Sequence, residues 1–223
     1  MNIMEIKKIE KAFENKYSLL LTSLILLIIL SPIVNDYPLI NFFIESFLLV
    51  IAIMMWISSA HKVFIFIVIS FAVAAMLFHY SARFIFDNRY MGLVALFTYI
   101  LYIGTAIIFL LKKIFSEEKV TSDTIKGGIS VYLLIGIWWE VLYTTIWVFN
   151  TSSFVLHVNR IDSPDFFYFS IITLTTLGYG DIIAVSHVAK TAALIQAITG
   201  QMYVAILIAR LVSLHTVDSY KKH

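Results

Sequence analysis

Long apolar runs constrain the fold of this chain more than any other feature of its sequence. A helix needs about 17–25 apolar residues to cross the roughly 30 Å hydrocarbon core of a membrane, and six runs reach that length. They cover residues 17–34, 39–57, 63–80, 90–111, 129–149 and 188–212. Only 13% of the residues are charged, compared with about 25% in soluble domains. We therefore expect an all-α, multi-pass membrane protein with six transmembrane helices.

The composition also excludes several classes of protein. A net charge of +2 is too small to suggest nucleic-acid binding, and the absence of cysteine excludes disulfides and zinc–thiolate sites. The sequence shows no nucleophile–base pattern, phosphate-binding loop or metal-ligand spacing that would suggest an enzyme. We expect no organic cofactor and no nucleic-acid partner.

The basic residues in the loops predict the orientation of the chain. Lysines are concentrated before the first run, between the second and third, between the fourth and fifth, and at the C-terminal end. These loops lie on one side of the membrane if there are six crossings, and basic loops are usually cytoplasmic. Both termini are therefore expected in the cytoplasm, with the protein in the inner or plasma membrane of the cell.

A shorter apolar segment, residues 165–176, lies between the fifth and sixth runs. It is too short to cross the membrane, so we expect it to enter and return on the outer side. Ser163 is the predicted helix cap, Pro164 suits the first helical position, and Asp165 faces the positive end of the helix.

The segment after this re-entrant helix, residues 173–181, reads Thr-Leu-Thr-Thr-Leu-Gly-Tyr-Gly-Asp. A cation that leaves water needs a ring of oxygens in place of its hydration shell. Gly178 and Gly180 can adopt positive φ without a Cβ clash, which allows successive backbone carbonyls to point to one axis. Thr176 adds a side-chain hydroxyl at the inner mouth.

This motif resembles the selectivity filter of potassium channels. The overall layout resembles bacterial-type six-transmembrane potassium channels of the voltage-gated-like superfamily. The resemblance implies K⁺ sites at Thr176, Leu177, Gly178, Tyr179 and Gly180, supported by Thr175, Asp181 and an aromatic cuff of Phe167, Tyr168 and Phe169. One chain provides one filter strand and the ring needs four, so a homotetramer is expected. Leu177 stands where the family more often has valine. Ala184 stands where a proline is common, which bears on the rigidity of the outer loop.

The last run carries the predicted gate. Gly200 follows Gly180 at the offset where many potassium channels have a hinge glycine, although close packing against the pore helix explains it equally well. Helical spacing from Gly200 predicts that four residues line the cavity and narrow toward the cytoplasm: Gln201, Val204, Ile208 and Val212. The tail at 214–223 leaves no room for a cytoplasmic ligand-binding domain.

Two features of the remaining spans bear on gating. The fourth run has no basic residue between Met91 and Leu111, so it lacks the charges that a voltage sensor moves through the field, and we expect weak voltage dependence. Glu140 lies in mid-membrane on the fifth run, where a charge is costly. It is either a neutral carboxyl in a structural hydrogen bond or a pH sensor.

These expectations divide the chain into five parts. They are a cytoplasmic amphipathic N-terminus (1–16), a four-helix peripheral domain (17–114), a cytoplasmic linker (115–128), a pore domain (129–213) and a short cytoplasmic tail (214–223). The predicted function is passive K⁺ conduction. Two alternatives remain open: a poorly selective cation channel, and a non-conducting accessory subunit of other channels.

Overall fold

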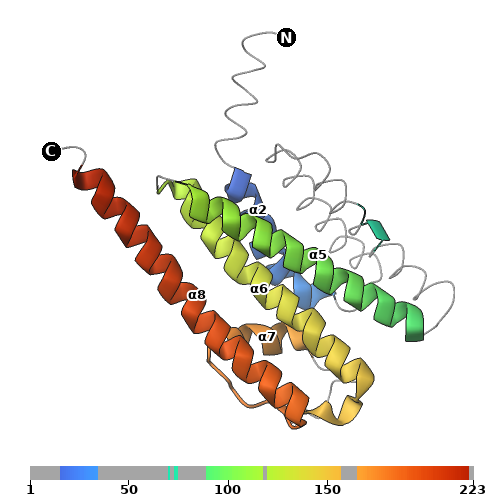
Figure 1. The fold of residues 1–223 in the computed structure, drawn as a ribbon. Helices are drawn as coiled ribbons and strands as arrows, with labels where there is room; N and C mark the ends of the chain where they lie inside the picture. Colours follow the sequence, from blue (N-terminus) through green and yellow to red (C-terminus); the bar gives the residue numbers. More distant parts are fainter. Residues whose placement is uncertain are drawn as a thin grey trace.

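The structure, a computed structural model, describes residues 16–34, 70, 73–74, 89–117, 120–156 and 165–220. Side chains at 16, 30–34, 89, 91 and 214–220 are not described. Within these ranges the α-helices are α2 (Lys16–Val34), α5 (Arg89–Ser116), α6 (Ser122–Phe149), α7 (Phe166–Leu174) and α8 (His187–Tyr220) (Figure 1). The described part of the chain is thus mostly helical, as predicted.

Three segments in the described part of the chain are long and apolar enough to cross a membrane: Gly92–Ser116, Ser122–Phe149 and His187–Ser213. They contain the predicted fifth and sixth spans and overlap the fourth, which was expected at 90–111. The predicted first span, residues 17–34, coincides with α2 except for Lys16. The predicted spans at 39–57 and 63–80 lie outside the described residues, apart from 70 and 73–74, and so does the N-terminal segment before Lys16.

Helices extend into two of the segments that were expected to connect or follow the spans. α5 continues to Ser116 and α6 begins at Ser122, so both helices reach into the linker expected at 115–128. The early start of α6 has a local cause: Thr121 caps the helix, its hydroxyl accepting from the Thr124 N–H at 3.1 Å, while the Thr124 hydroxyl accepts from the Thr121 N–H. At the other end, α8 continues to Tyr220, through most of the predicted tail at 214–223.

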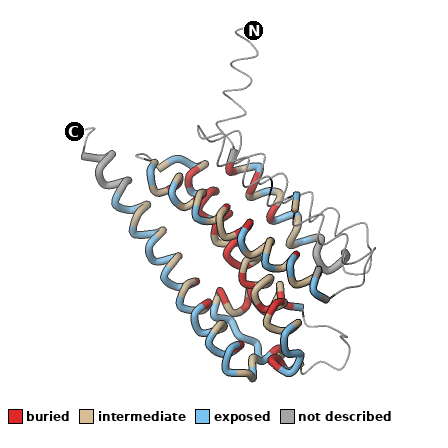
Figure 2. The backbone as a smooth tube through the Cα atoms, turned by 45° about the vertical axis from the view of Figure 1, so that its right-hand side comes forward, coloured by how far each residue is buried: buried red, intermediate tan, exposed pale blue. Residues whose placement is uncertain are grey.

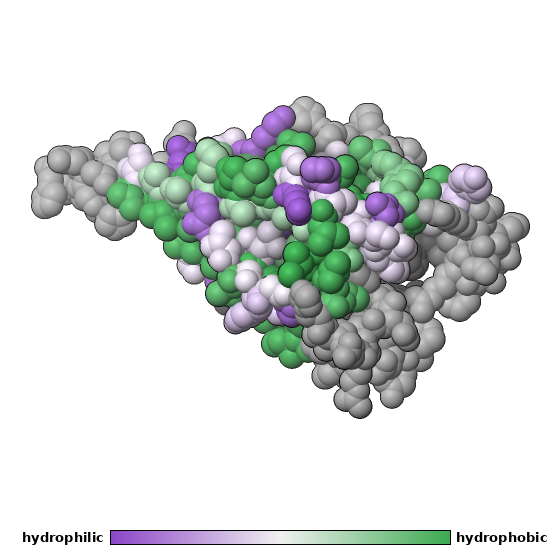
Figure 3. Space-filling view, turned by 90° about the horizontal axis from the view of Figure 1, so that it is seen from below, coloured by the Kyte–Doolittle hydropathy of each residue, from purple (hydrophilic) through white to green (hydrophobic). Residues whose placement is uncertain are grey.

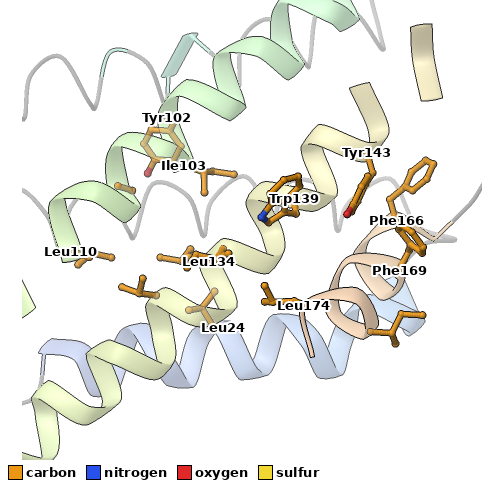
Figure 4. Packing of buried hydrophobic residues seen from close by; sticks show 14 of the residues in the cluster. Leu24, Tyr102, Ile103, Leu110, Leu134, Trp139, Tyr143, Phe166, Phe169 and Leu174 are labelled. Atoms are coloured by element: carbon orange, nitrogen blue, oxygen red, sulfur yellow. The ribbon is translucent and has the colours of Figure 1, made fainter. Parts of the chain in front are cut away.

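α6 is the central helix of the described fold, and it contacts α2, α5, α7 and α8. Buried residues are concentrated along it, whereas α8 is mostly exposed (Figure 2). The core around α6 includes Leu24 of α2, Tyr102 of α5, Leu134 and Trp139 of α6, and Leu174 of α7 (Figure 4).

Polar contacts fix the two peripheral helices on α6. The Asp123 carboxylate accepts from the backbone N–H groups of Tyr17 and Ser18, at 3.2 Å each, and so caps the first turn of α2. On α5, the Ile100 carbonyl accepts from the Trp138 indole at 2.9 Å. Interhelical hydrogen bonds of this kind hold membrane helices together where the hydrophobic effect does not.

Among the described residues, the fold also contains a small antiparallel sheet. Strand β1 (Phe154–Leu156) follows α6 and the 3-10 turn Thr151–Ser153, and strand β2 (Ile182–Ala184) follows the filter segment. The strands pair Phe154 with Ala184, Val155 with Ile183 and Leu156 with Ile182.

Candidate functional site

The short helix α7 is the predicted re-entrant segment, and it lies against α6 and α8 (Figure 1). Its cap is Asp165, whose carboxylate accepts from the Tyr168 N–H at 2.9 Å. The prediction that Ser163 caps this helix is therefore wrong; Ser163 and Pro164 lie outside the described residues. A carboxylate at this position satisfies a free N–H and also complements the positive end of the helix.

The aromatic residues of α7 divide into two sets. Phe166 and Phe169 are buried, and Phe169 packs edge-on against Tyr143 of α6, with ring centroids 4.9 Å apart (Figure 4). Phe167 and Tyr168 are half-buried. Of the predicted cuff, then, Phe169 belongs to the core of its own chain. Phe166 and Tyr143 are core members that sequence reasoning missed.

Along residues 176–180, the sign of the backbone angle φ alternates from one residue to the next. Thr176, Gly178 and Gly180 have φ values of +60°, +53° and +81°, and Leu177 and Tyr179 do not have positive φ. Such alternation turns successive carbonyls toward the same side of the strand, the arrangement that a cation-coordinating backbone requires. Positive φ at Thr176 was not foreseen, because a β-branched residue rarely adopts it.

The inner end of this filter segment is tied to the pore helix. The Leu177 N–H donates to the Ile172 carbonyl at 2.8 Å, and the Gly178 N–H approaches the same oxygen at 3.3 Å. The rest of the segment lies open in a single chain: Leu177 is 61% exposed and Tyr179 is 70% exposed.

Viewed from below, the molecule presents broad hydrophobic areas between smaller hydrophilic ones (Figure 3).

Asp181 follows the filter segment directly. The Tyr168 side chain interacts electrostatically with its carboxylate. Within the described residues the Asp181 Oδ1 atom is buried and accepts no hydrogen bond. The contact links the outer end of the segment to α7, where the sequence suggested an anchor.

Gly200 allows α8 to approach the C-terminal end of α7. A Cβ atom at this position would lie 2.2 Å from the Leu174 carbonyl oxygen, a separation that real Cβ atoms do not show. The same oxygen accepts from the Tyr132 hydroxyl of α6 at 3.2 Å. Of the two explanations left open by the sequence, close packing therefore has a direct structural basis. A role as a hinge stays a prediction.

One face of α8 contacts the rest of its own chain, at Gln196, Gly200, Tyr203, Leu207 and Arg210. The spacing of four and three residues marks a single helical stripe. The opposite stripe is exposed and contains Ile198, Gln201, Ala205, Ile208 and Val212.

Three of the four predicted cavity residues, Gln201, Ile208 and Val212, therefore lie opposite the contact stripe. Val204 is 40% exposed and lies between the two faces. Ala205, and not Val204, lies at the centre of the exposed stripe. The Gln201 amide also reaches the Thr176 hydroxyl, with Nε2 and Oγ1 3.4 Å apart. This contact puts Gln201 beside the inner end of the filter segment.

A buried hydrogen-bond network joins α6, α7 and α8, and sequence reasoning missed it. Gln196 is fully buried. Its amide accepts from the Tyr143 hydroxyl at 2.5 Å and donates to the Ser170 hydroxyl at 2.7 Å. Ser170 in turn donates to the Gly136 carbonyl at 2.6 Å. The only signal in the sequence was a glutamine within an apolar run, which fits a cavity-lining residue as well as a buried one.

Glu140 is half-buried on α6. None of the described residues donates a hydrogen bond to its carboxylate, and the charge of Asp165 lies close enough to influence it. The structural hydrogen bond that is one of the two expectations for Glu140 is therefore not present among the described residues. The sensing role stays a prediction.

Comparison with known proteins adds one finding. Residues 137–216 match a family model described as an ion channel, Ion_trans_2. The match covers roughly a third of the chain and includes part of α6, all of α7, the filter segment and most of α8. No curated protein and no solved structure matches the chain. Together with the three long apolar helices, the match supports a membrane protein with an ion-channel pore segment.

Proposed function

We propose that this chain forms a K⁺-selective channel in which four copies surround one axis. Potassium passes along the backbone carbonyls of Thr176, Leu177, Gly178 and Tyr179. The observation that carries the proposal is the alternating hand of residues 176–180, directly after the C-terminal end of α7. Ion passage of this kind involves no chemical turnover.

The exposed backbone of the filter segment supports assembly into a tetramer. Non-helical backbone at membrane depth is tolerated only where it is buried in protein or lines a water-filled path. In a single chain, residues 176–180 are exposed. Three further copies around the axis convert this surface into the lining of a pore and supply the remaining oxygens of each ring.

In the proposed tetramer, the cavity below the filter favours a cation. The C-terminal end of α7 carries the partial negative charge of a helix terminus, and four such ends surround the axis in a tetramer. The exposed stripe of α8 places the Gln201 amide next to Thr176 and the apolar side chains of Ile208 and Val212 beyond it. We propose that these two residues narrow the cytoplasmic end of the pore.

The proposal includes weak voltage dependence. Moving one charge through the field changes the free energy of opening by ~2.3 kcal/mol per 100 mV. In α5, no basic residue occurs between Arg89 and Lys112. The chain is proposed to lie in the cell membrane with both termini in the cytoplasm.

Ion flux through liposomes that contain only this purified chain tests the function. We expect K⁺ efflux that Ba²⁺ blocks, with far slower Na⁺ efflux. Equal rates for Na⁺ and K⁺ identify the poorly selective channel instead. Complete absence of flux from correctly inserted protein identifies the accessory subunit, because that role needs another chain to conduct.

A further inference from the structure

The filter segment continues without interruption into the small sheet. Asp181 ends the motif, and β2 begins at the next residue, Ile182. Beyond the paired strands, the Ser153 carbonyl accepts from the Val185 N–H at 2.9 Å and from the Ser186 N–H at 3.3 Å. The chain that leaves the filter is thus held by backbone hydrogen bonds over the whole length of β2 and one turn beyond it.

The partner strand is fixed to the core of the molecule. Phe154 of β1 is 6% exposed, and its ring centroid lies 4.8 Å from that of Phe166 and 5.6 Å from that of Phe169. Both phenylalanines belong to the pore helix. β1 therefore connects the exit of the filter to the helix that also holds its entrance.

The central pair of the sheet contributes mainly through its backbone. Val155 and Ile183 remain 41% and 39% exposed, so their side chains bury little surface. Antiparallel ladders alternate between hydrogen-bonded and non-hydrogen-bonded pairs. The Val185 N–H donates to the Ser153 carbonyl, so by the register Val155 and Ile183 form the next hydrogen-bonded pair, and the Ala184 N–H points away from β1.

Apart from the contact of Asp181 with Tyr168, the filter has little other support from its own chain at this end. A Cβ atom built at Gly178 or Gly180 meets nothing within 4 Å. Aligned carbonyl oxygens repel one another when no cation lies between them. An arrangement of this kind keeps its shape between ions only if both ends are held.

We infer that the pair β1–β2, here called the strap, positions the outer end of the filter and prevents its distortion when the ion sites empty. This inference rests on the proposed function. It also gives a reason for Ala184, which stands where related channels commonly have a proline: backbone pairing supplies the rigidity of the outer loop. Ile183 and Val155 are the positioning residues, acting through their main chains.

The first test compares three variants of the full chain. Ile183→Pro removes one strap hydrogen bond, Ile183→Ala removes only the side chain, and Ala184→Pro removes an N–H that the strap does not use. We expect Ile183→Pro to lose K⁺ current about fivefold faster than wild type when external K⁺ is withdrawn, and to admit more Na⁺. Ile183→Ala and Ala184→Pro retain the wild-type rate and selectivity. If Ile183→Pro assembles and behaves as wild type, the inference is wrong.

The second test does not depend on the folding of a proline variant. The chain has no cysteine, so Val155→Cys with Ile183→Cys introduces the only two thiols. Hydrogen-bonded antiparallel pairs have Cα atoms about 5.5 Å apart, within the range that disulfides span. We expect the bond to form within each chain of the folded protein and to slow the loss of current on K⁺ withdrawal, reversibly on reduction. A bond that fails to form, or that leaves the rate unchanged, contradicts the strap.

The two tests separate this inference from the proposed function. Wild-type protein that conducts no K⁺ contradicts the function, whatever the thiols do. Wild-type protein that conducts K⁺ while neither the proline nor the disulfide alters the filter contradicts the strap alone.

Discussion

Three residues of the filter segment have positive φ, a conformation that residues other than glycine seldom adopt. Thr176 is β-branched and has a φ of +60°, which costs of order 1–3 kcal/mol for a residue outside the glycine region. Glycine at 178 and 180 avoids that cost, whereas threonine at 176 accepts it and keeps a hydroxyl beside Gln201. The strain at this one position fits the proposed function, in which the backbone hand at Thr176 directs a carbonyl toward the ion path.

Gly200 gives a prediction at the same scale. Gly200→Ala forces a methyl group toward the Leu174 carbonyl, which belongs to the backbone and cannot move aside cheaply. We expect a loss of stability of about 1–3 kcal/mol, seen as a lower thermal midpoint of the detergent-solubilised protein by tryptophan fluorescence.

Gly92→Ala is the matched control for this substitution. Gly92 also lies in a long helix, α5, but a Cβ atom there meets nothing within 4 Å. Replacing glycine by alanine in an open helical position stabilises by up to about 1 kcal/mol. Equal midpoints for the two variants contradict the close approach of α8 to α7.

At the scale of elements, the pore helix is held between its two neighbours by small residues and buried polar groups. Gly136 of α6 faces Ile171, and Gly200 of α8 faces Leu174. Gln196 then joins all three helices through Ser170 and Tyr143. Because α7 carries the filter, these contacts set the position at which the filter begins.

A double-mutant cycle on Gln196 and Tyr143 tests this arrangement. Gln196→Leu and Tyr143→Phe each leave a buried polar group unpaired, which costs about 1–3 kcal/mol. We expect both single variants to lower the thermal midpoint, and the double variant to lose less than the sum, because both ends of the bond are then apolar. Strict additivity of the two losses rules out a coupled network.

Parts of this arrangement follow from the sequence and parts do not. Helix α7 and the three long helices were predictable, because apolar length and the run from Thr175 to Gly180 are local signals. The glycine conformations followed from the chemistry of the motif. Asp165 as the cap was missed because Ser163 and Pro164 offered an equally good local start.

The strap and the Gln196 network were not predictable for a different reason. Strands of three residues are too short to show an alternating pattern, and β1 and β2 pair across residues far apart in the chain. Similarly, the side of α8 that contacts its own chain depends on Gly200, Leu207 and Arg210 meeting other helices. The sequence does not reveal this contact stripe. Helical spacing alone therefore assigned Val204, and not Ala205, to the cavity.

At the scale of the whole molecule, contacts along α8 join this helix to the rest of the chain. Near its C-terminal end, the Arg210 guanidinium donates to the Phe115 carbonyl at 2.7 Å and to the Glu117 carbonyl at 3.2 Å. These carbonyls lie at the C-terminal end of α5, where a cation is favoured. Helix α5, which has no charged residue between Met91 and Leu111, is thereby linked to α8.

The filter segment is exposed in the single chain. Exposed polar backbone from Thr176 to Gly180 has no stable place in lipid, and in the proposed tetramer it joins the same backbone of the other copies in a continuous ring of oxygens. The account therefore makes one claim about the assembled protein: these carbonyls replace the hydration shell of K⁺ and fit Na⁺ poorly.

The reversal potential of wild-type channels between pure K⁺ and pure Na⁺ solutions tests that claim most directly. The account predicts a large displacement from zero, toward the value for a membrane permeable only to K⁺. A reversal potential near zero in these solutions, with current carried equally by Na⁺, contradicts it.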